Sequence, residues 1–402
     1  IMDYYDNGLI NDSKDGKNVL PSVVYEKKVE KDETNASGED NKKVSIIGIS
    51  GRFPEARSVA ELWNIVLNGK EVIQDVSRHG WDGSKKRRMG VLPGVGEFDP
   101  KFFEITPLEA EKMDPRQRLL LEEAWKALED AGYNSYNHDK DKVGIFVGAE
   151  ESDYRATVSN DRMITANSTA ILAARMAYYM NFRGPNMCIN TACSSGLVAL
   201  HEAVLSLNTG ECDVAIVAGV NLLTSSDSYD GMDRASMLSP DGHCYAFDKR
   251  ANGMVPAEAI AVLVLMSEER AKHFGYHIYA NVVGSGVNYD GKTNGITAPN
   301  GVAQVELLED IYKRYNIDTN DIDYIVTHGT GTKLGDPIEV NSLFEVYKKG
   351  MKEKQYCALT SIKPNIGHSQ AASGLVNLII LSLSMKNAII PPTINCEEPN
   401  DY

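Results

Sequence analysis

The sequence predicts an α/β fold whose sheets are buried and partly parallel. Short runs of β-branched and apolar residues alternate along the chain with segments of helical apolar spacing, a pattern typical of strands connected by crossover helices. Hydrophobic residues make up 43% and charged residues 24% of the 402 residues, as in ordinary globular proteins. At this length we expect two or three domains, or one large duplicated α/β unit.

The predicted strands are short, rich in β-branched side chains and close to glycine residues. In chain order they cover residues 44–49, 142–148, 187–190, 213–219, 260–266, 278–284 and 322–327. The predicted helices cover residues 113–131, 199–207, 301–315 and 374–386. Pro115 and Gly132 mark the two ends of the first helix. Residues 195–198 and 373–376 both read Ser-Gly-Leu-Val, which suggests a duplication.

Composition excludes several classes of protein. The net charge of −15 argues against nucleic acid as the main partner, because phosphates must be neutralised by clustered basic residues. No apolar run reaches the roughly 18 residues needed to span a membrane, and the first 30 residues lack the apolar core of a signal peptide. The six cysteines form no Cys-x-x-Cys pair. We therefore expect a reduced, cytoplasmic chain without disulfide or metal frameworks.

Residues 1–43 are polar and show no sustained periodicity, so we expect a flexible linker. The first residue, Ile1, suggests a piece of a longer protein. Residues 84–88 form the only dense basic run. We interpret this run as a solvated loop, with a docking site for an acidic partner as the alternative.

The strongest chemical signal surrounds Cys193. A strand at 187–190 leads into a turn of small residues and then a helix that begins near Cys193. The positive end of the helix dipole would stabilise the thiolate, and the helix N–H groups could bind an oxyanion. On this segment alone, a nucleophile and a small buried hydrophobic residue are equally good interpretations of Cys193.

Two histidines favour catalysis. His328 follows a predicted strand in a turn of glycine and threonine, and His368 follows Asn365-Ile366-Gly367 before a helix. Functional residues often lie in such loops at strand ends. A lone histidine there would be more often structural, but two of them together with a cysteine turn indicate nucleophilic chemistry.

The chain resembles the β-ketoacyl synthase domains of modular polyketide synthases, in the thiolase-like family, from about residue 43 to its end. The motifs that carry the resemblance occur in the family's order and spacing. They are Gly51-Arg52-Phe53-Pro54, Met113-Asp114-Pro115-Arg116-Gln117-Arg118, Thr191-Ala192-Cys193-Ser194-Ser195, residues 288–295, the His328 segment and residues 365–368.

The resemblance implies a domain from 44 to 402 with two duplicated βαβαβ halves, about 44–275 and 276–402, layered as an α-β-α-β-α sandwich. It also implies that Cys193 takes an acyl chain from an acyl carrier protein, and that the chain is then extended by decarboxylative condensation with a malonyl carrier protein. His328 and His368 would stabilise the developing oxyanion. Lys363 would order the pocket near His368, and Thr330 and Thr332 would bind the phosphopantetheine arm.

The family further implies a homodimer that pairs through the strand 187–190, neighbouring polyketide synthase domains, and no bound cofactor, since the carrier protein brings the 4′-phosphopantetheine. Val255-Pro256, Glu258-Ala259, Asn252-Gly253 and residues 327–333 resemble the branch served by a free-standing acyltransferase. The family's C-terminal Phe-Gly turn is absent from the sequence, so we expect a truncated chain, whose activity on its own the resemblance leaves open.

Three alternatives remain open at this point. The domain could accept and transfer acyl chains without extending them, although retention of both histidines favours extension. It could instead be a structural module for dimerisation and docking. A papain-like hydrolase is the weakest alternative, because two histidines in glycine-rich turns exceed what that chemistry needs.

Overall fold

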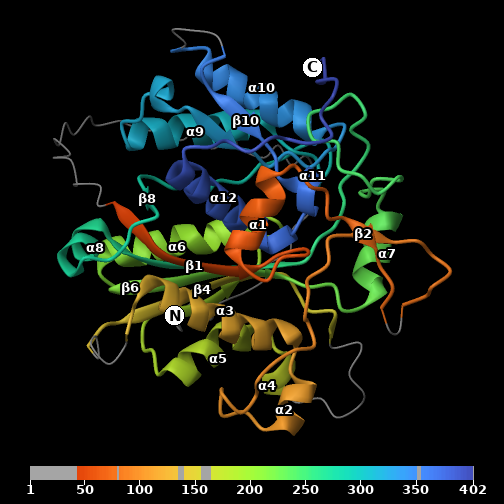
Figure 1. Cartoon of the computed structure of the whole chain (residues 1–402). Helices are drawn as coiled ribbons and strands as arrows, with labels where there is room; N and C mark the ends of the chain where they lie inside the picture. Colours follow the sequence, from red (N-terminus) through yellow and green to blue (C-terminus); the bar gives the residue numbers. More distant parts are fainter. Residues whose placement is uncertain (1–42, 79–80, 135–139, 155–163, 351–354, 402) are drawn as a thin grey trace, which may run out of the picture. The chain divides into compact units, whose positions relative to one another are not determined.

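The structure, a computed structural model, describes residues 43–78, 81–134, 140–154, 164–350 and 355–401. The predicted linker therefore lies, except for Lys43, outside the described residues. The main feature of the described structure is a six-stranded mixed sheet in the order β5-β4-β6-β7-β1-β8 (Figure 1). The strands are β1 (Val44–Arg52), β4 (Val143–Ala149), β5 (Asn186–Ile189), β6 (Val214–Asn221), β7 (Ala259–Ser267) and β8 (Ala280–Val282).

The sheet is parallel on one side and antiparallel on the other. β4 pairs in parallel with both β5 and β6, whereas β7 runs antiparallel to β6 and β1, and β1 runs antiparallel to β8. Every residue of β1, β4 and β6 is buried. Continuous burial is why these strands read as unbroken apolar runs in the sequence, and the predicted partly parallel α/β fold is confirmed.

Helices cover both faces of this sheet. On one face, α3 (Pro115–Ala131) and α5 (Ala170–Met180) pack with strand residues such as Ile145 and Val147. On the other face, α6 (Ser195–Thr209) and α12 (Ser373–Asn387) pack with Phe146. Adjacent strand residues thus contribute to different core clusters, as the two-residue period of a strand requires. Figure 1 shows α3 and α5 on the side of the sheet opposite α6 and α12.

Local signals set the bounds of α3. The Asp114 carboxylate accepts a hydrogen bond from the Arg116 backbone N–H at 2.8 Å and caps the helix, and Pro115 occupies its first position. Gly132 ends the helix in the left-handed conformation, with φ of 66°. The helix predicted for residues 113–131 is confirmed, with its start two residues later.

The C-terminal part carries a smaller sheet among the described residues. β9 (Tyr324–Val326) and β10 (Ala358–Thr360) form a parallel pair, and α9 (Gly301–Arg314) packs with α10 (Gly335–Tyr347). β8 belongs by its hydrogen bonds to the large sheet, although residues 276–402 were assigned to the second half. The two halves are therefore unequal in their described strands, and the boundary at 275 stays a prediction.

The two Ser-Gly-Leu-Val segments, residues 195–198 and 373–376, lie where α6 and α12 contact each other. A Cβ atom placed on Gly196 would lie 2.7 Å from the Ala371 carbonyl oxygen and 3.1 Å from Leu375 Cγ. A Cβ atom on Gly374 would lie 2.3 Å from Leu197 Cγ. The glycine near the start of α6 thus contacts the start of α12, and the glycine near the start of α12 contacts the start of α6. A duplicated unit predicts such a symmetric pair of contacts.

Shorter elements complete the described chain. Gln74–Asp75 (β2) and Arg88–Met89 (β3) form a small antiparallel pair. The remaining helices are α1 (Val59–Leu67), α2 (Pro107–Lys112), α4 (Ile164–Asn167), α7 (Ser226–Arg234), α8 (Glu268–Phe274) and α11 (Lys363–Ile366), with 3₁₀ turns at Thr319–Asp321 and Gln370–Ala372. Within the part of the chain that the structure describes, no helix has both the length and the apolarity to cross a bilayer.

Candidate active site

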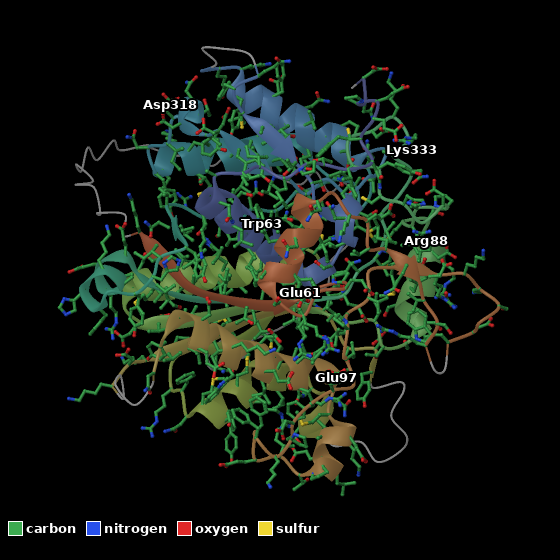
Figure 2. All side chains as sticks on the ribbon, viewed as in Figure 1. Glu61, Trp63, Arg88, Glu97, Asp318 and Lys333 are labelled. Carbon is green, nitrogen blue, oxygen red and sulfur yellow. The ribbon has the colours of Figure 1, made fainter. Side chains whose placement is uncertain are left out.

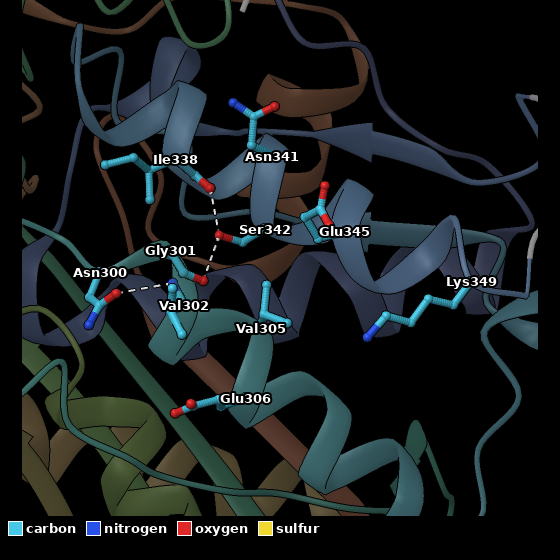
Figure 3. Close-up of a pocket in the computed structure, with 10 residues that line it drawn as sticks. All are labelled: Asn300, Gly301, Val302, Val305, Glu306, Ile338, Asn341, Ser342, Glu345 and Lys349. Atoms are coloured by element: carbon cyan, nitrogen blue, oxygen red, sulfur yellow. Dashed lines mark hydrogen bonds between the residues drawn. The ribbon is translucent and has the colours of Figure 1, made fainter.

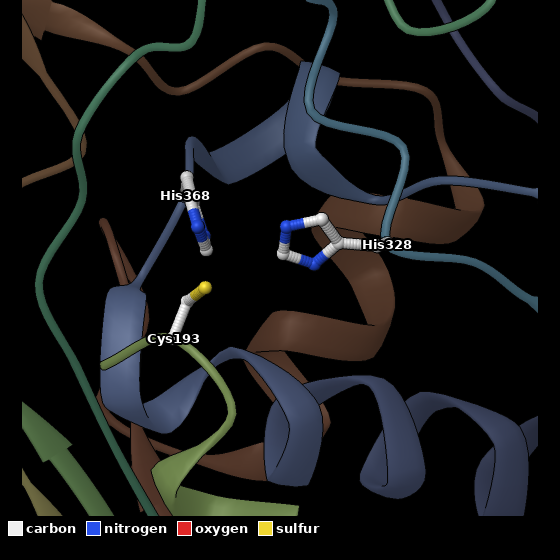
Figure 4. Close-up of side chains that lie close together, drawn as sticks. All are labelled: Cys193, His328 and His368. Carbon is white, nitrogen blue, oxygen red and sulfur yellow. The ribbon is translucent and has the colours of Figure 1, made fainter. Parts of the chain in front are cut away.

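Three predicted site residues meet at one point. Cys193 lies between β5 and α6, His328 follows β9, and His368 follows α11. One ligand atom of each side chain lies within 4.8 Å of those of the other two. The two imidazole rings are 5.1 Å apart and nearly perpendicular, at 86° (Figure 4).

The turn that carries Cys193 is strained and tightly bonded. Ala192 has a φ of +55°, a conformation that is costly for a residue with a side chain. The Ser195 hydroxyl accepts a hydrogen bond from the Thr191 N–H at 2.9 Å and donates one to the Ala192 carbonyl at 2.6 Å. This ring of hydrogen bonds fixes the backbone on both sides of Cys193, so the sulfur is held at the start of α6.

The surroundings of Cys193 favour its protonated thiol on balance. Burial raises the pKa of the Cys193 thiol, and the Glu150 carboxylate raises it further, although the Lys363 ammonium lowers it. The helix itself begins only at Ser195, two residues beyond the sulfur. Desolvation of the charged form therefore outweighs the favourable charge of Lys363, and the effect of the helix dipole on Cys193 stays a prediction.

His328 is fixed through its backbone. Its N–H donates to Glu339 Oε1 at 2.6 Å, and the next N–H, of Gly329, donates to Glu339 Oε2 at 2.8 Å. The Lys363 ammonium donates to the His328 carbonyl oxygen. Lys363 thus orders His328, whereas the sequence analysis placed its effect near His368.

Glu339, on α10, was not identified from the sequence. The only signal available was a glutamate close after the turn that bears His328, and surface helices carry many such residues. Burial raises the pKa of the Glu339 carboxyl, and the two N–H donors and Lys363 oppose that rise. The charged form of the Glu339 carboxyl group is therefore stabilised by these partners, and their hydrogen bonds link α10 to the site.

His368 is held between the residues that precede β7. Its N–H donates to the Val255 carbonyl at 2.6 Å, and its carbonyl accepts from the Ala257 N–H at 2.9 Å. The side chain is 3% exposed, and its Nδ1 atom has no hydrogen-bond partner among the described residues.

Both imidazoles are held in the neutral form. Desolvation by neighbouring protein atoms, then the Lys363 ammonium, lowers the pKa of His328, although the residue is an exposed one by its accessible surface. Burial lowers the pKa of His368 well below its usual value, and Lys363 and His328 add to the effect. Near pH 7 each ring can then donate one N–H to a developing oxyanion.

Thr330 and Thr332 lie in the turn after His328. Their hydroxyl oxygens are 3.2 Å apart, and the Thr332 hydroxyl accepts from the Gly335 N–H at 3.1 Å. The buried Asp336 carboxylate, which the sequence analysis did not identify, accepts from the N–H groups of Gly331 and Phe247. The turn is therefore rigid, with one threonine buried and the other half-buried.

The donor set is also compatible with a soft metal ion, although the sequence predicts no metal site. Cysteine sulfur and histidine nitrogen are zinc ligands. The spread of up to 4.8 Å between the atoms exceeds the roughly 3.5 Å edge of a tetrahedral zinc site. The three side chains are therefore too far apart to hold a metal ion in this geometry, but they leave room for a reacting group between them.

The basic run at residues 84–88 folds onto α7. Arg87 is 2% exposed and makes two hydrogen bonds of 3.0 Å to Asp230, which Lys85 approaches to 3.6 Å. Arg88, marked in Figure 2, lies on β3 and is 3.6 Å from Glu71. Three of the four basic residues in the predicted solvated loop thus have acidic partners, which reduces the charge left for docking.

A separate cavity of about 480 Å³ lies between α9 and α10 (Figure 3). Its lining combines the apolar side chains of Val302, Val305 and Ile338 with polar and charged ones, and the Ser342 hydroxyl there donates to the Gly301 and Ile338 carbonyls. None of Cys193, His328 and His368 lines this cavity. We therefore place the candidate active site at the cysteine and the two histidines.

Comparison with protein families agrees with this geometry. The N-terminal domain of β-ketoacyl synthase matches residues 41–271, and the C-terminal domain of β-ketoacyl synthase matches residues 279–397. The chain belongs to the β-ketoacyl synthase family. It has the thiolase-like α/β fold of the ketosynthases, and members of the family are acyltransferases that form carbon–carbon bonds.

The relatives are modular polyketide synthases. The chain is 48% identical over 368 residues to polyketide synthase PksM of Bacillus subtilis, and 45% identical over 363 residues to polyketide synthase ThaG of Burkholderia thailandensis. Each match covers 89% of this chain but only 9% and 6% of those proteins. The ketosynthase domain is therefore a small part of the relatives it matches.

Solved ketosynthases have the same fold. The ketosynthase from module 6 of the bacillaene synthase of Bacillus subtilis matches with a TM-score of 0.85 and 44% identity, over 89% of this chain and 64% of that one. The oxazolomycin ketosynthase domain OzmH KS7 of Streptomyces albus matches with a TM-score of 0.84 and 31% identity, over 90% and 65%. The fold predicted by the resemblance is thereby confirmed.

Proposed function

We propose that this ketosynthase domain takes an acyl chain from an acyl carrier protein onto Cys193 and extends it by decarboxylative condensation with a malonyl carrier protein. The observation that carries the proposal is the meeting of Cys193, His328 and His368 within 4.8 Å. These side chains come from three segments separated by many residues, and each is fixed by hydrogen bonds of its own backbone or turn.

The first step is acyl transfer between two sulfur atoms. The Cys193 sulfur attacks the carbonyl carbon of the carrier thioester, a new carbon–sulfur bond forms, and the bond to the carrier sulfur breaks. The proton of the Cys193 thiol ends on the departing carrier thiol. Because burial favours the protonated thiol, the proton leaves the Cys193 sulfur only as that sulfur attacks. The lowered pKa values of His328 and His368 make both imidazoles weak bases, so they act here as N–H donors to the thioester oxygen.

The second step forms the carbon–carbon bond. The malonyl group loses carbon dioxide, and the electron pair of the broken bond gives an enolate on its thioester oxygen. Two neutral N–H donors, one from each histidine, stabilise that negative charge. The enolate carbon attacks the acyl carbon on Cys193, the Cys193 sulfur leaves as a thiolate, and this thiolate takes a proton from water.

Lys363 is proposed to act as a positioning residue. Its ammonium binds the His328 carbonyl, and its positive charge disfavours protonation of both histidines. Thr330 and Thr332 are proposed to bind the phosphopantetheine arm that a carrier protein delivers, so that the domain needs no bound cofactor of its own. Their rigid turn beside His328 supports this role.

The proposed partners are acyl carrier proteins, neighbouring polyketide synthase domains and a second copy of the chain. β5 is an edge strand of the large sheet with partly exposed residues, which supports dimerisation through this strand. We also propose that a separate acyltransferase supplies the extender unit. The support comes from the sequence details at residues 252–259 and 327–333 given above.

Intact-mass measurement tests the nucleophile. We expect the chain to gain the mass of one acyl group after incubation with an acyl carrier thioester, and the Cys193→Ala variant to gain none. A malonyl carrier protein added next should release a product two carbons longer. An acylated Cys193 that never yields this product would identify an acyl-transferring domain, and equal labelling of the variant would contradict the proposal.

A further inference from the structure

Glu150 stands at the active-site edge of the sheet, immediately after β4. In the parallel pairing of β4 with β5, Gly148 lies opposite Ile189, so Glu150 and the Cys193 turn leave the sheet at the same end. A Cβ atom on Gly148 would lie 2.5 Å from Gly196 N, which shows how closely β4 meets the start of α6. The chain therefore brings Glu150 beside the nucleophile.

The backbone of Glu150 is anchored, but its carboxyl group is not. Arg116 donates a hydrogen bond to the Glu150 carbonyl oxygen at 2.6 Å. The same guanidinium binds the Asp114 carboxylate at 2.9 and 3.0 Å, so Asp114 and not Glu150 is its carboxylate partner. Oε1 of Glu150 is buried and has no hydrogen-bond partner among the described residues.

The charge of the Glu150 carboxyl group acts on Cys193, as expected for two groups at the same end of the sheet. Burial raises the pKa of the Glu150 carboxyl, with only a partial opposing effect of Arg116. In turn, the charge of Glu150 raises the pKa of the Cys193 thiol. A buried acceptor without a partner costs about 1–3 kcal/mol, and a ligand that supplies a donor recovers that cost.

We propose that Glu150 determines acyl-chain specificity by hydrogen bonding to a hydroxyl group on the chain attached to Cys193. This inference rests on the proposed function, because it assigns a substrate class to the same site. A hydroxylated chain pairs with the buried oxygen, whereas a saturated chain leaves it unpaired. A site that hydrogen-bonds a hydroxyl discriminates strongly against an analogue without it.

The test compares two thioesters of N-acetylcysteamine, one 3-hydroxybutyryl and one butyryl. The rate of Cys193 acylation by each is followed by intact mass over a range of thioester concentrations. We expect the parent chain to prefer the hydroxylated substrate in kcat/KM by about tenfold or more. Glu150→Met should abolish the preference and accelerate butyryl transfer, and Glu150→Gln, which keeps a carbonyl acceptor, should retain most of it.

Glu151→Met is the matched control. Glu151 is the neighbouring exposed carboxylate, and its Oε2 accepts from the Thr169 hydroxyl at 3.2 Å. This variant should keep the preference of the parent chain. Equal rates for both thioesters in the parent chain, or an unchanged preference in Glu150→Met, would overturn the inference while leaving Cys193 acylation intact. Failure of both thioesters to acylate Cys193 would instead count against the proposed function. A melting temperature for each variant separates lost selectivity from lost folding.

Discussion

At the scale of single residues, burial determines the chemistry of the site. Cys193, His328 and His368 could be identified from the sequence because each lies in a turn of small residues after a predicted strand. Their protonation could not, because it depends on how much protein surrounds each group. Desolvation keeps the thiol protonated and the imidazoles neutral. The Lys363 ammonium lowers the pKa of the Cys193 thiol, against the effect of burial, and lowers the pKa of both imidazoles, in the same direction as burial. One ammonium thus influences all three groups.

The raised pKa of Cys193 predicts its alkylation behaviour. The thiolate is the reactive form, so the rate constant for iodoacetamide should still be rising with pH above the ordinary thiol pKa of about 8.5. Lys363→Met should move the profile to higher pH, because it removes the positive charge that favours the thiolate. Modification at Cys193 is followed by peptide mass spectrometry, with a small free thiol as the control. A midpoint below that of the free thiol would contradict the burial argument.

At the scale of elements, close backbone contacts hold the active-site helix. Most of the long strands and helices were predicted, because buried β-branched runs and apolar helical spacing leave clear patterns, but the long helices α5 and α10 were not. β2, β3 and α7 were not predicted, because two-residue strands and a helix without buried residues leave none. The glycines that permit helix contacts could be seen in the sequence, but the contacts themselves depend on the packing of α6 against β4 and α12.

Gly148 and Gly374 predict unequal costs for the same substitution. In Gly148→Ala the new methyl group would lie 2.5 Å from backbone atoms of Ser195 and Gly196. We expect a loss of about 3 kcal/mol in the free energy of unfolding, at the upper end for overpacking, and slower acylation of Cys193. In Gly374→Ala the obstacle is the side chain of Leu197, which is 46% exposed and can rotate away. This loss should be clearly smaller in a denaturant titration, and equal losses would contradict the distinction.

At the scale of the whole molecule, polar contacts between distant segments join the site to the sheet. The sequence predicts the alternation of strands and helices, but not that β8 would pair with β1 or that the described strands of the halves would be unequal. Pairings of this kind are decided by the shape of the folded chain. Glu258, at the start of β7, is fully buried and binds both Arg78 and the N–H groups of Leu92 and Leu223.

The Arg78–Glu258 ion pair helps to hold His368. Glu258 directly follows Ala257, whose N–H donates to the His368 carbonyl. Both contacts of the Arg78 guanidinium with the Glu258 carboxylate are 2.6 Å long. Their partners are 180 residues apart in the sequence, so no local pattern reveals them. The loop that bears Arg78 thereby supports the segment that holds His368.

Arg78→Met should therefore destabilise the fold and weaken condensation more than acylation. Removal of one partner of a buried ion pair costs about 3–5 kcal/mol, because the other charge is left uncompensated. Glu258→Gln in the same chain should restore part of that loss, since the amide carbonyl can still accept from a backbone N–H. Denaturant titrations of the single and double variants measure the coupling. Arg57→Met, at the exposed pair with Glu97, is the matched control and should change stability little. If the two arginine variants were equally stable, the Arg78–Glu258 pair would not be the contact that secures His368.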